Sequence, residues 1–69
     1  MKPIEWREES RDFWRSECGR FDVFPDASRR GQFVAVDWEC GVKRKGFTDI
    51  ERAKVWCQLV AKRATEMAR

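Results

Sequence analysis

The chain has 69 residues, of which 39% are charged and 42% are hydrophobic, and its formal net charge is +3. This length allows one small domain with a thin core, in which four Trp and five Phe supply most of the apolar bulk. No segment approaches the roughly 20 apolar residues of a membrane span, and the first residues lack the apolar core of a signal peptide, so the composition predicts a cytosolic protein.

The first quarter of the chain has two interpretations. Interpreted as strands, residues 4–7 and 13–18 are short aromatic segments separated by a polar turn. Interpreted as a helix, residues 4–18 place their aromatic side chains near one face, but Glu9 and Glu17 interrupt that stripe. The strand interpretation fits the pattern better, and the helix stays open as the alternative.

Two segments in the middle of the chain alternate in the manner of half-buried strands. Residues 19–24 place Phe21 and Val23 inward and end at a Pro-Asp turn signal, which residues 27–31 extend into a hairpin loop. Residues 32–40 contain one alternating set that we expect to face the core and a second set that we expect to face water. The first set is Val34, Val36, Trp38 and Cys40, and the second is Phe33, Ala35, Asp37 and Glu39.

The end of the chain predicts a strand followed by a helix. Residues 42–47 form the strand, in which Gly46 is a candidate for a bulge. The helix is expected to begin at a capping box, in which Thr48 and Glu51 satisfy each other's backbone N–H groups. Its apolar residues recur three and four positions apart, which keeps one side toward the core. They are Ile50, Ala53, Cys57, Val60, Ala64 and Met67, with Trp56 and either Leu59 or Ala61 widening that side.

These elements together predict an α+β fold. We expect a small antiparallel β-meander of three to four strands, packed against one C-terminal α-helix. The chain forms a single domain over residues 1–69, with strands and turns over about 4–47 and the helix over about 49–68.

The residue types give no support to catalysis. The chain contains no His and no Tyr, so the commonest general base is missing and no imidazole can activate a serine. Cys18, Cys40 and Cys57 are odd in number and lack CxxC spacing, so we expect free thiols. Because metal-ligand spacings and Gly-rich phosphate loops are also absent from the sequence, we expect no catalytic residue, no metal and no cofactor.

The charges are divided unevenly along the chain. Residues 1–26 carry five bases against seven acids, a net charge of −2, whereas residues 27–69 carry ten bases against five acids, a net charge of +5. One small body should therefore present two electrostatically different surfaces, and recognition by a surface is the expected mode of action.

Two candidate surfaces follow from this division. The acidic candidate binds protein, and consists of carboxylates expected on neighbouring strands together with an exposed aromatic anchor: Glu17, Asp22, Asp37 and Glu39, with Phe33 as the anchor. For Phe33, a second small apolar cluster is an equally open interpretation. The basic candidate binds nucleic acid, and consists of bases in the hairpin loop and in the last strand: Arg29, Arg30, Lys43, Arg44 and Lys45.

Two resemblances bear on the target. Over about residues 20–64, three strands followed by a helix that begins GFTDIERA resemble DNA-binding domains of the integrase-arm type, in which a sheet enters the major groove. The chain as a whole opens MKPIEWREESRDFWRSECGRF and closes on GFTDIERAKVWCQLVAKRA, and it resembles the short phage-borne anti-CRISPR proteins that act on type I-C systems. That class is a collection of unrelated small folds without a shared motif, so the resemblance assigns no residue.

The second resemblance implies a non-enzymatic inhibitor, expressed from a phage or mobile element in the bacterial cytoplasm. Such an inhibitor binds a protein subunit of the CRISPR effector complex Cascade, and blocks target-DNA binding or nuclease recruitment. We expect a monomer without a membrane partner. A small DNA-binding module of the β-sheet type is the alternative, and only in that case is nucleic acid the partner.

Overall fold

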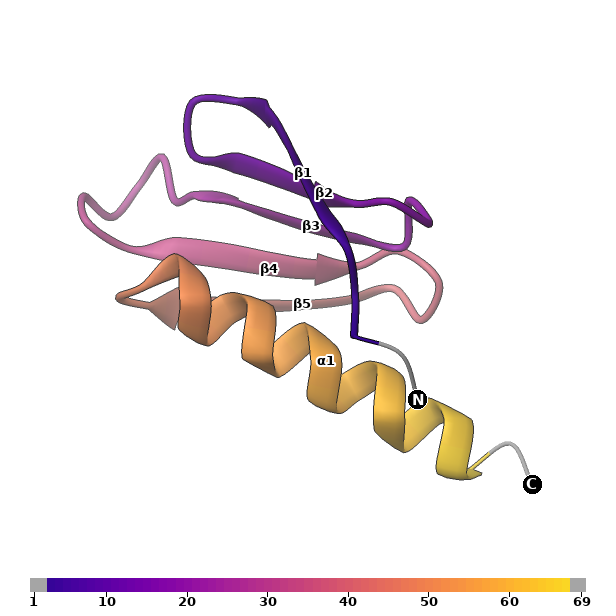
Figure 1. The fold of residues 1–69 in the computed structure, drawn as a ribbon. Helices are drawn as coiled ribbons and strands as arrows, with labels where there is room; N and C mark the ends of the chain where they lie inside the picture. Colours follow the sequence, from indigo (N-terminus) through magenta and orange to yellow (C-terminus); the bar gives the residue numbers. More distant parts are fainter. Residues whose placement is uncertain (1–2, 68–69) are drawn as a thin grey trace.

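The computed structural model describes residues 3–67, and the side chains of residues 3–63. It contains a five-stranded antiparallel sheet with one helix across one face (Figure 1). The strands are β1 (Trp6–Ser10), β2 (Phe13–Ser16), β3 (Phe21–Pro25), β4 (Phe33–Asp37) and β5 (Val42–Phe47), and the helix is α1 (Ile50–Met67). The predicted α+β class is confirmed, with five strands rather than three or four. In the first quarter of the chain, the strand interpretation is correct.

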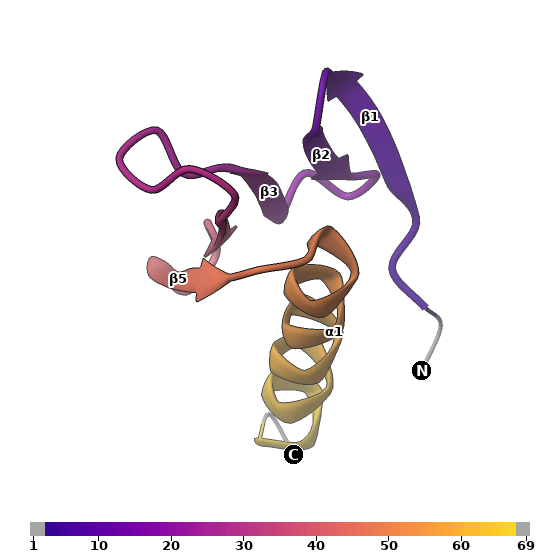
Figure 2. The same cartoon turned by 90° about the vertical axis from the view of Figure 1, so that its left-hand side faces the viewer.

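The strands lie side by side in chain order, so each is joined to the next by a hairpin. Helix α1 packs against β3, β4 and β5, and the sheet curls so that β1 lies to one side of the helix and β5 to the other (Figure 2). The fully buried core is small. From α1 it receives only small side chains, while Ile50, Trp56 and Val60 of the helix are partly buried around it. The core consists of Phe21, Val23 and Ala35 from the sheet and Ala53, Cys57 and Ala61 from α1.

The helix presents the predicted residues Ile50, Ala53, Trp56, Cys57 and Val60 to the core. Of the two candidates for widening its apolar side, Ala61 is buried and Leu59 is 51% exposed. The side chains of Ala64 and Met67 lie outside the described residues. Lys54 lies between the helix and the sheet, with its ammonium nitrogen 3.6 Å from the ring centre of Trp14.

The expectation for the two sides of β4 is wrong. Phe21 is paired with Asp37 and Val23 with Ala35, so Ala35 and Asp37 face the helix. Val34, Val36 and Trp38 therefore belong to the opposite face, called the open face below. Val34 and Val36 are nevertheless buried among the neighbouring side chains of the sheet, whereas Trp38 is 61% exposed. Alternation identified the two sets, but both sets contain apolar residues, so the pattern did not show which of them meets the helix.

Two local features mark the ends of β5. Gly46 has a φ of +90°, and the pairing of β4 with β5 shifts between Phe33 and Ala35, so the predicted bulge is confirmed. At the helix start, the capping residue is Asp49 rather than Thr48. Asp49 Oδ1 accepts a hydrogen bond of 2.9 Å from the Glu51 N–H, because the helix begins at Ile50 and the residue directly before it occupies the N-cap.

Candidate functional site

Asp37, a predicted surface residue, forms a buried ion pair with Arg20. Arg20 Nε donates to Asp37 Oδ1 at 3.0 Å and Arg20 Nη2 donates to Oδ2 at 2.9 Å, while the Asp37 side chain is 0% exposed. Oδ1 also accepts the backbone N–H groups of Glu39 and Cys40 at 3.1 and 3.3 Å. Burial by itself raises the pKa of Asp37, but the hydrogen bonds from Arg20 and Cys40 outweigh it and hold the pKa below its ordinary value. Asp37 is therefore an ionised structural group.

Asp22 is also buried, on the open face. Its Oδ1 accepts a hydrogen bond of 3.0 Å from Arg15 Nε, and its Oδ2 accepts one of 2.8 Å from Trp38 Nε1. Only 3% of the residue is exposed. Its charge is thus compensated within the fold, and a partner protein cannot reach it.

The predicted acidic surface does not exist as a continuous row. Asp22 and Asp37 lie on opposite faces of the sheet, as their pairing shows, and both are buried. Glu17 is exposed and lies 3.1 Å from Arg7, and Glu39 is 70% exposed and lies 3.5 Å from Arg20. Phe33 is half-buried and paired with Phe47 rather than free as an anchor. Periodicity cannot reveal this arrangement, although an Asp directly before a turn is a signal for backbone capping.

Four of the five bases predicted to bind nucleic acid lie on one side of the molecule, and the fifth lies apart from them. Lys43, Arg44 and Lys45 are exposed on β5, which is an edge strand of the sheet. Arg29, from the β3–β4 loop, lines a shallow depression together with Lys45. Among the described residues, no carboxylate lies within ion-pair distance of these four bases. We call Arg29, Lys43, Arg44 and Lys45 the basic edge. Arg30, the fifth predicted base, lines a separate depression that also contains Asp12 and Asp26.

The β3–β4 loop that carries Arg29 is held by its own hydrogen bonds. The N–H of Asp26 donates to the carbonyl of Gln32 at 2.8 Å, which closes the loop. Asp26 Oδ1 accepts hydrogen bonds from the hydroxyl and the backbone N–H of Ser28, and these bonds lower the pKa of Asp26. These hydrogen bonds fix the backbone of the loop that carries Arg29 and Arg30.

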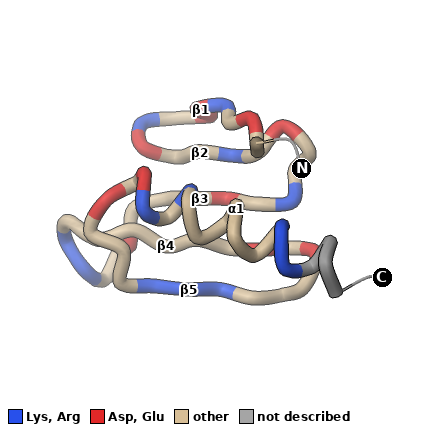
Figure 3. The backbone as a smooth tube through the Cα atoms, turned by 60° about the horizontal axis from the view of Figure 1, so that its bottom comes forward, with Lys and Arg blue, Asp and Glu red and all other residues tan. Residues whose placement is uncertain are grey.

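The uneven distribution of charge along the sequence corresponds to a difference in charge between the two edge strands of the sheet. Strand β1 carries two acids and one base, whereas β5 at the other edge of the sheet carries bases as its only charged residues (Figure 3). The charges thus differ between the two edges of one sheet, while the central acids Asp22 and Asp37 are buried on opposite faces.

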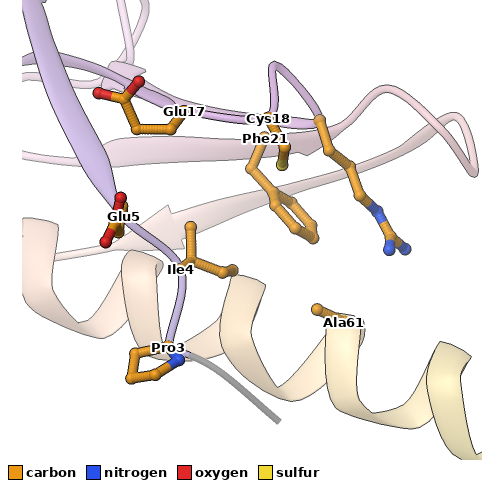
Figure 4. Close-up of a pocket in the computed structure, with 8 residues that line it drawn as sticks. Pro3, Ile4, Glu5, Glu17, Cys18, Phe21 and Ala61 are labelled. Atoms are coloured by element: carbon orange, nitrogen blue, oxygen red, sulfur yellow. The ribbon is translucent and has the colours of Figure 1, made fainter.

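A hollow of about 570 Å³ lies between the N-terminal segment and α1 (Figure 4). Ile4, Phe21 and Ala61 give it apolar walls, and the Ile4 N–H fixes the segment by donating to Gln58 Oε1 at 2.8 Å. Cys18 lies at this hollow. The pKa of its thiol is lowered by a hydrogen bond with the Ser16 hydroxyl and by one with the backbone of Arg20. The hollow contains no His to act as a base, because the chain has none.

No family model matches the chain, and neither a curated protein nor a solved structure matches it. Over residues 3–67, no helix is long and apolar enough to cross a membrane. In the same part of the chain, no group of three or more His, Cys, Asp or Glu side chains is placed to hold a metal ion.

Proposed function

We propose that the protein is a non-catalytic inhibitor that binds a protein subunit of a bacterial CRISPR Cascade effector, in the cytoplasm of the host cell. Binding blocks target-DNA binding or nuclease recruitment. The whole-chain resemblance to anti-CRISPR proteins of the type I-C class supports this target. The residue types support the mode of action, because a chain without His, Tyr or metal-ligand spacing is suited to stoichiometric blocking rather than to chemistry.

The basic edge is the observation that carries the proposed mode of binding. It combines three exposed bases of the edge strand β5 with Arg29 of the β3–β4 loop, and among the described residues none of the four has a carboxylate within ion-pair distance. A surface of this sign attracts an acidic partner surface and speeds the encounter with it. Because the basic edge is positively charged, it does not resemble the negatively charged phosphate backbone of DNA. Contact with an acidic protein surface is therefore favoured over imitation of DNA.

A pull-down with purified Cascade, followed by a target-DNA shift assay, tests the proposal. We expect the protein to be retained by the effector, and the shift assay then tells which step is blocked. If bound Cascade no longer shifts its target, DNA binding is the blocked step; if it still does, nuclease recruitment is. Failure of the protein to bind the effector at all would end the proposal.

A DNA-binding module is the second candidate, because Arg29 and Lys45 converge on one depression from different elements. Such a module binds bare duplex DNA, and its affinity falls steeply as salt is added, since each phosphate contact releases counterions. Titration of the purified protein against duplex DNA at several salt concentrations tests this candidate. An absence of binding at low salt excludes it.

A further inference from the structure

The open face of the sheet carries the exposed ring of Trp38, a half-buried pair of Phe rings, and lysines that have no carboxylate within ion-pair distance among the described residues. We propose that this face binds single-stranded nucleic acid, with bases stacking on Trp38 and on the Phe13–Phe24 pair, and with phosphates held by Lys43 and Lys45. The proposal does not rest on the binding of Cascade, because the purified protein alone should bind the ligand.

Strand pairing fixes which side chains share the open face. Arg15 is paired with Asp22, Asp22 with Val36, and Val36 with Lys43, which gives a row of side chains across four strands. Phe24 and its partner Val34 lie on one side of this row. Trp38 lies on the other side, four residues after Val34. A β-strand rises about 3.3 Å per residue, so the backbones of Val34 and Trp38 are about 13 Å apart. The face therefore offers two distinct stacking positions, one beside Val34 and one at Trp38.

Trp38 is a preorganised ring. It is 61% exposed, yet its Nε1–H donates to Asp22 Oδ2 at 2.8 Å and its backbone N–H donates to the Arg20 carbonyl at 2.9 Å. The ring edge is therefore held by the sheet. A ring fixed before binding loses little conformational freedom when a base stacks on it, which favours affinity.

The second stacking position is a pair of rings. Phe13 and Phe24 are stacked with their centroids 5.6 Å apart and an angle of 15° between the ring planes. Both are half-buried, and the Arg15 guanidinium lies 5.8 Å from the centre of the Phe13 ring. An unpaired base can extend such a stack. Removal of one aromatic stacking partner typically weakens single-strand binding by roughly 5-fold to 150-fold.

Apart from the exposed Glu9 near Arg15, the charges on this face suit a phosphate backbone. Asp22, which would repel phosphate if it were free, is buried and compensated by Arg15. Asp37 points to the other face, and Glu17 is paired with Arg7. Lys43 and Lys45 have no carboxylate within ion-pair distance among the described residues.

Together these features favour single strands over a duplex. Base faces reach the rings of a sheet only when the bases are unstacked from one another, as they are in single strands. Stacking combined with a basic track is the chemistry of sequence-tolerant single-strand binding.

Fluorescence anisotropy of labelled oligonucleotides tests the proposal with the full chain. Oligothymidylate and oligouridylate are titrated, beside a duplex of equal length, at several salt concentrations. We expect tighter binding of the single strands than of the duplex. For two or three phosphate contacts, the logarithm of the association constant should fall against the logarithm of salt with a slope of about −1.4 to −2.1. Binding of either oligonucleotide supports the proposal, and oligodeoxyuridylate, which lacks both the 5-methyl group and the 2′-hydroxyl, separates the contributions of these two groups.

Four variants separate stacking from charge. Trp38→Ala and the double variant Lys43→Ala/Lys45→Ala should each weaken binding about tenfold, while Trp38→Phe, which keeps a ring, should retain most of it. Leu59→Ala is the control, because Leu59 is exposed on α1. Circular dichroism and thermal unfolding verify that each variant is folded. If Trp38→Ala does not fold, the lysine variant and Trp38→Phe still test the proposal. The absence of binding at low salt, equal affinity for the duplex, or unchanged affinity of folded Trp38→Ala would each overturn the proposal.

Discussion

Arg20 and Asp37 form a bidentate ion pair that joins the start of β3 to the end of β4. The two nitrogen–oxygen distances are 3.0 and 2.9 Å, and the carboxylate is completely buried. Because Asp37 also accepts the N–H groups of Glu39 and Cys40, it fixes the turn that leads into β5. One side chain thus holds together three consecutive parts of the sheet, including the strand that carries the basic edge.

Replacement of Asp37 should therefore unfold the domain. In Asp37→Ala, the Arg20 guanidinium, which is 16% exposed, loses its partner, and breaking a buried pair in this way costs about 3–5 kcal/mol. A domain of this size has about that much stability in total, so we expect no cooperative thermal transition. Glu39→Ala is the matched control, because Glu39 lies 3.5 Å from the same Arg20 but is 70% exposed. It should cost less than about 1 kcal/mol, and equal effects of the two substitutions would contradict the role of Asp37.

Acid should destabilise the fold in a defined pH window. Hydrogen bonds from Arg20 and Cys40 hold the folded pKa of Asp37 below its ordinary value of 3.8, despite burial. A carboxyl group of this kind stabilises the fold above its unfolded pKa, and that stabilisation is lost as the pH falls through the folded pKa. The urea midpoint should be constant from about pH 7 to pH 5 and should fall below about pH 4. A midpoint unchanged under strongly acidic conditions would show that Asp37 contributes no such stabilisation.

The sequence predicted the elements of this fold better than the contacts between them. Alternation and capping signals located the strands and the helix, because those patterns are local. The burial of Asp37 depends on Arg20, which lies 17 positions away and meets it only through the pairing of β3 with β4. Lys54 occupies a polar position of the helix pattern, but two Trp rings of the sheet draw its ammonium group inward. The acidic surface failed as a prediction for the same reason, since burial of a charge is decided by a partner distant in sequence.

The helix cap gives a test of local structure. Asp49→Ala removes the acceptor for the Glu51 N–H and should reduce the free energy of unfolding by about 1 kcal/mol. Thr48→Ala should have little effect, because Thr48 precedes the N-cap and is exposed. Urea denaturation of both variants measures the difference. A larger loss for Thr48→Ala than for Asp49→Ala would restore the capping box expected from the sequence.

The three cysteines should differ in reactivity. Cys18 and Cys40 are exposed, whereas Cys57 is buried against the sheet, and burial raises the pKa of its thiol to about 12. A thiol-specific chromogenic reagent at neutral pH should label Cys18 and Cys40 in the folded protein, and should reach Cys57 only in urea. Mass spectrometry of the labelled peptides identifies the sites. Rapid labelling of Cys57 without denaturant would be incompatible with its position in the core.

The proposed binding of Cascade through the basic edge is best tested by the affinity of a charge-reversed variant. Lys43→Glu/Lys45→Glu is compared with Arg52→Glu/Lys62→Glu, which makes the same change of charge at exposed positions of α1. Binding to purified type I-C Cascade is measured by surface plasmon resonance, after circular dichroism has shown that both variants are folded. We expect reversal on β5 to weaken binding at least tenfold and to slow association, while reversal on α1 should leave both nearly unchanged. Wild-type affinity of the β5 variant, or a lack of binding by the wild-type protein itself, would rule out binding of Cascade through the basic edge.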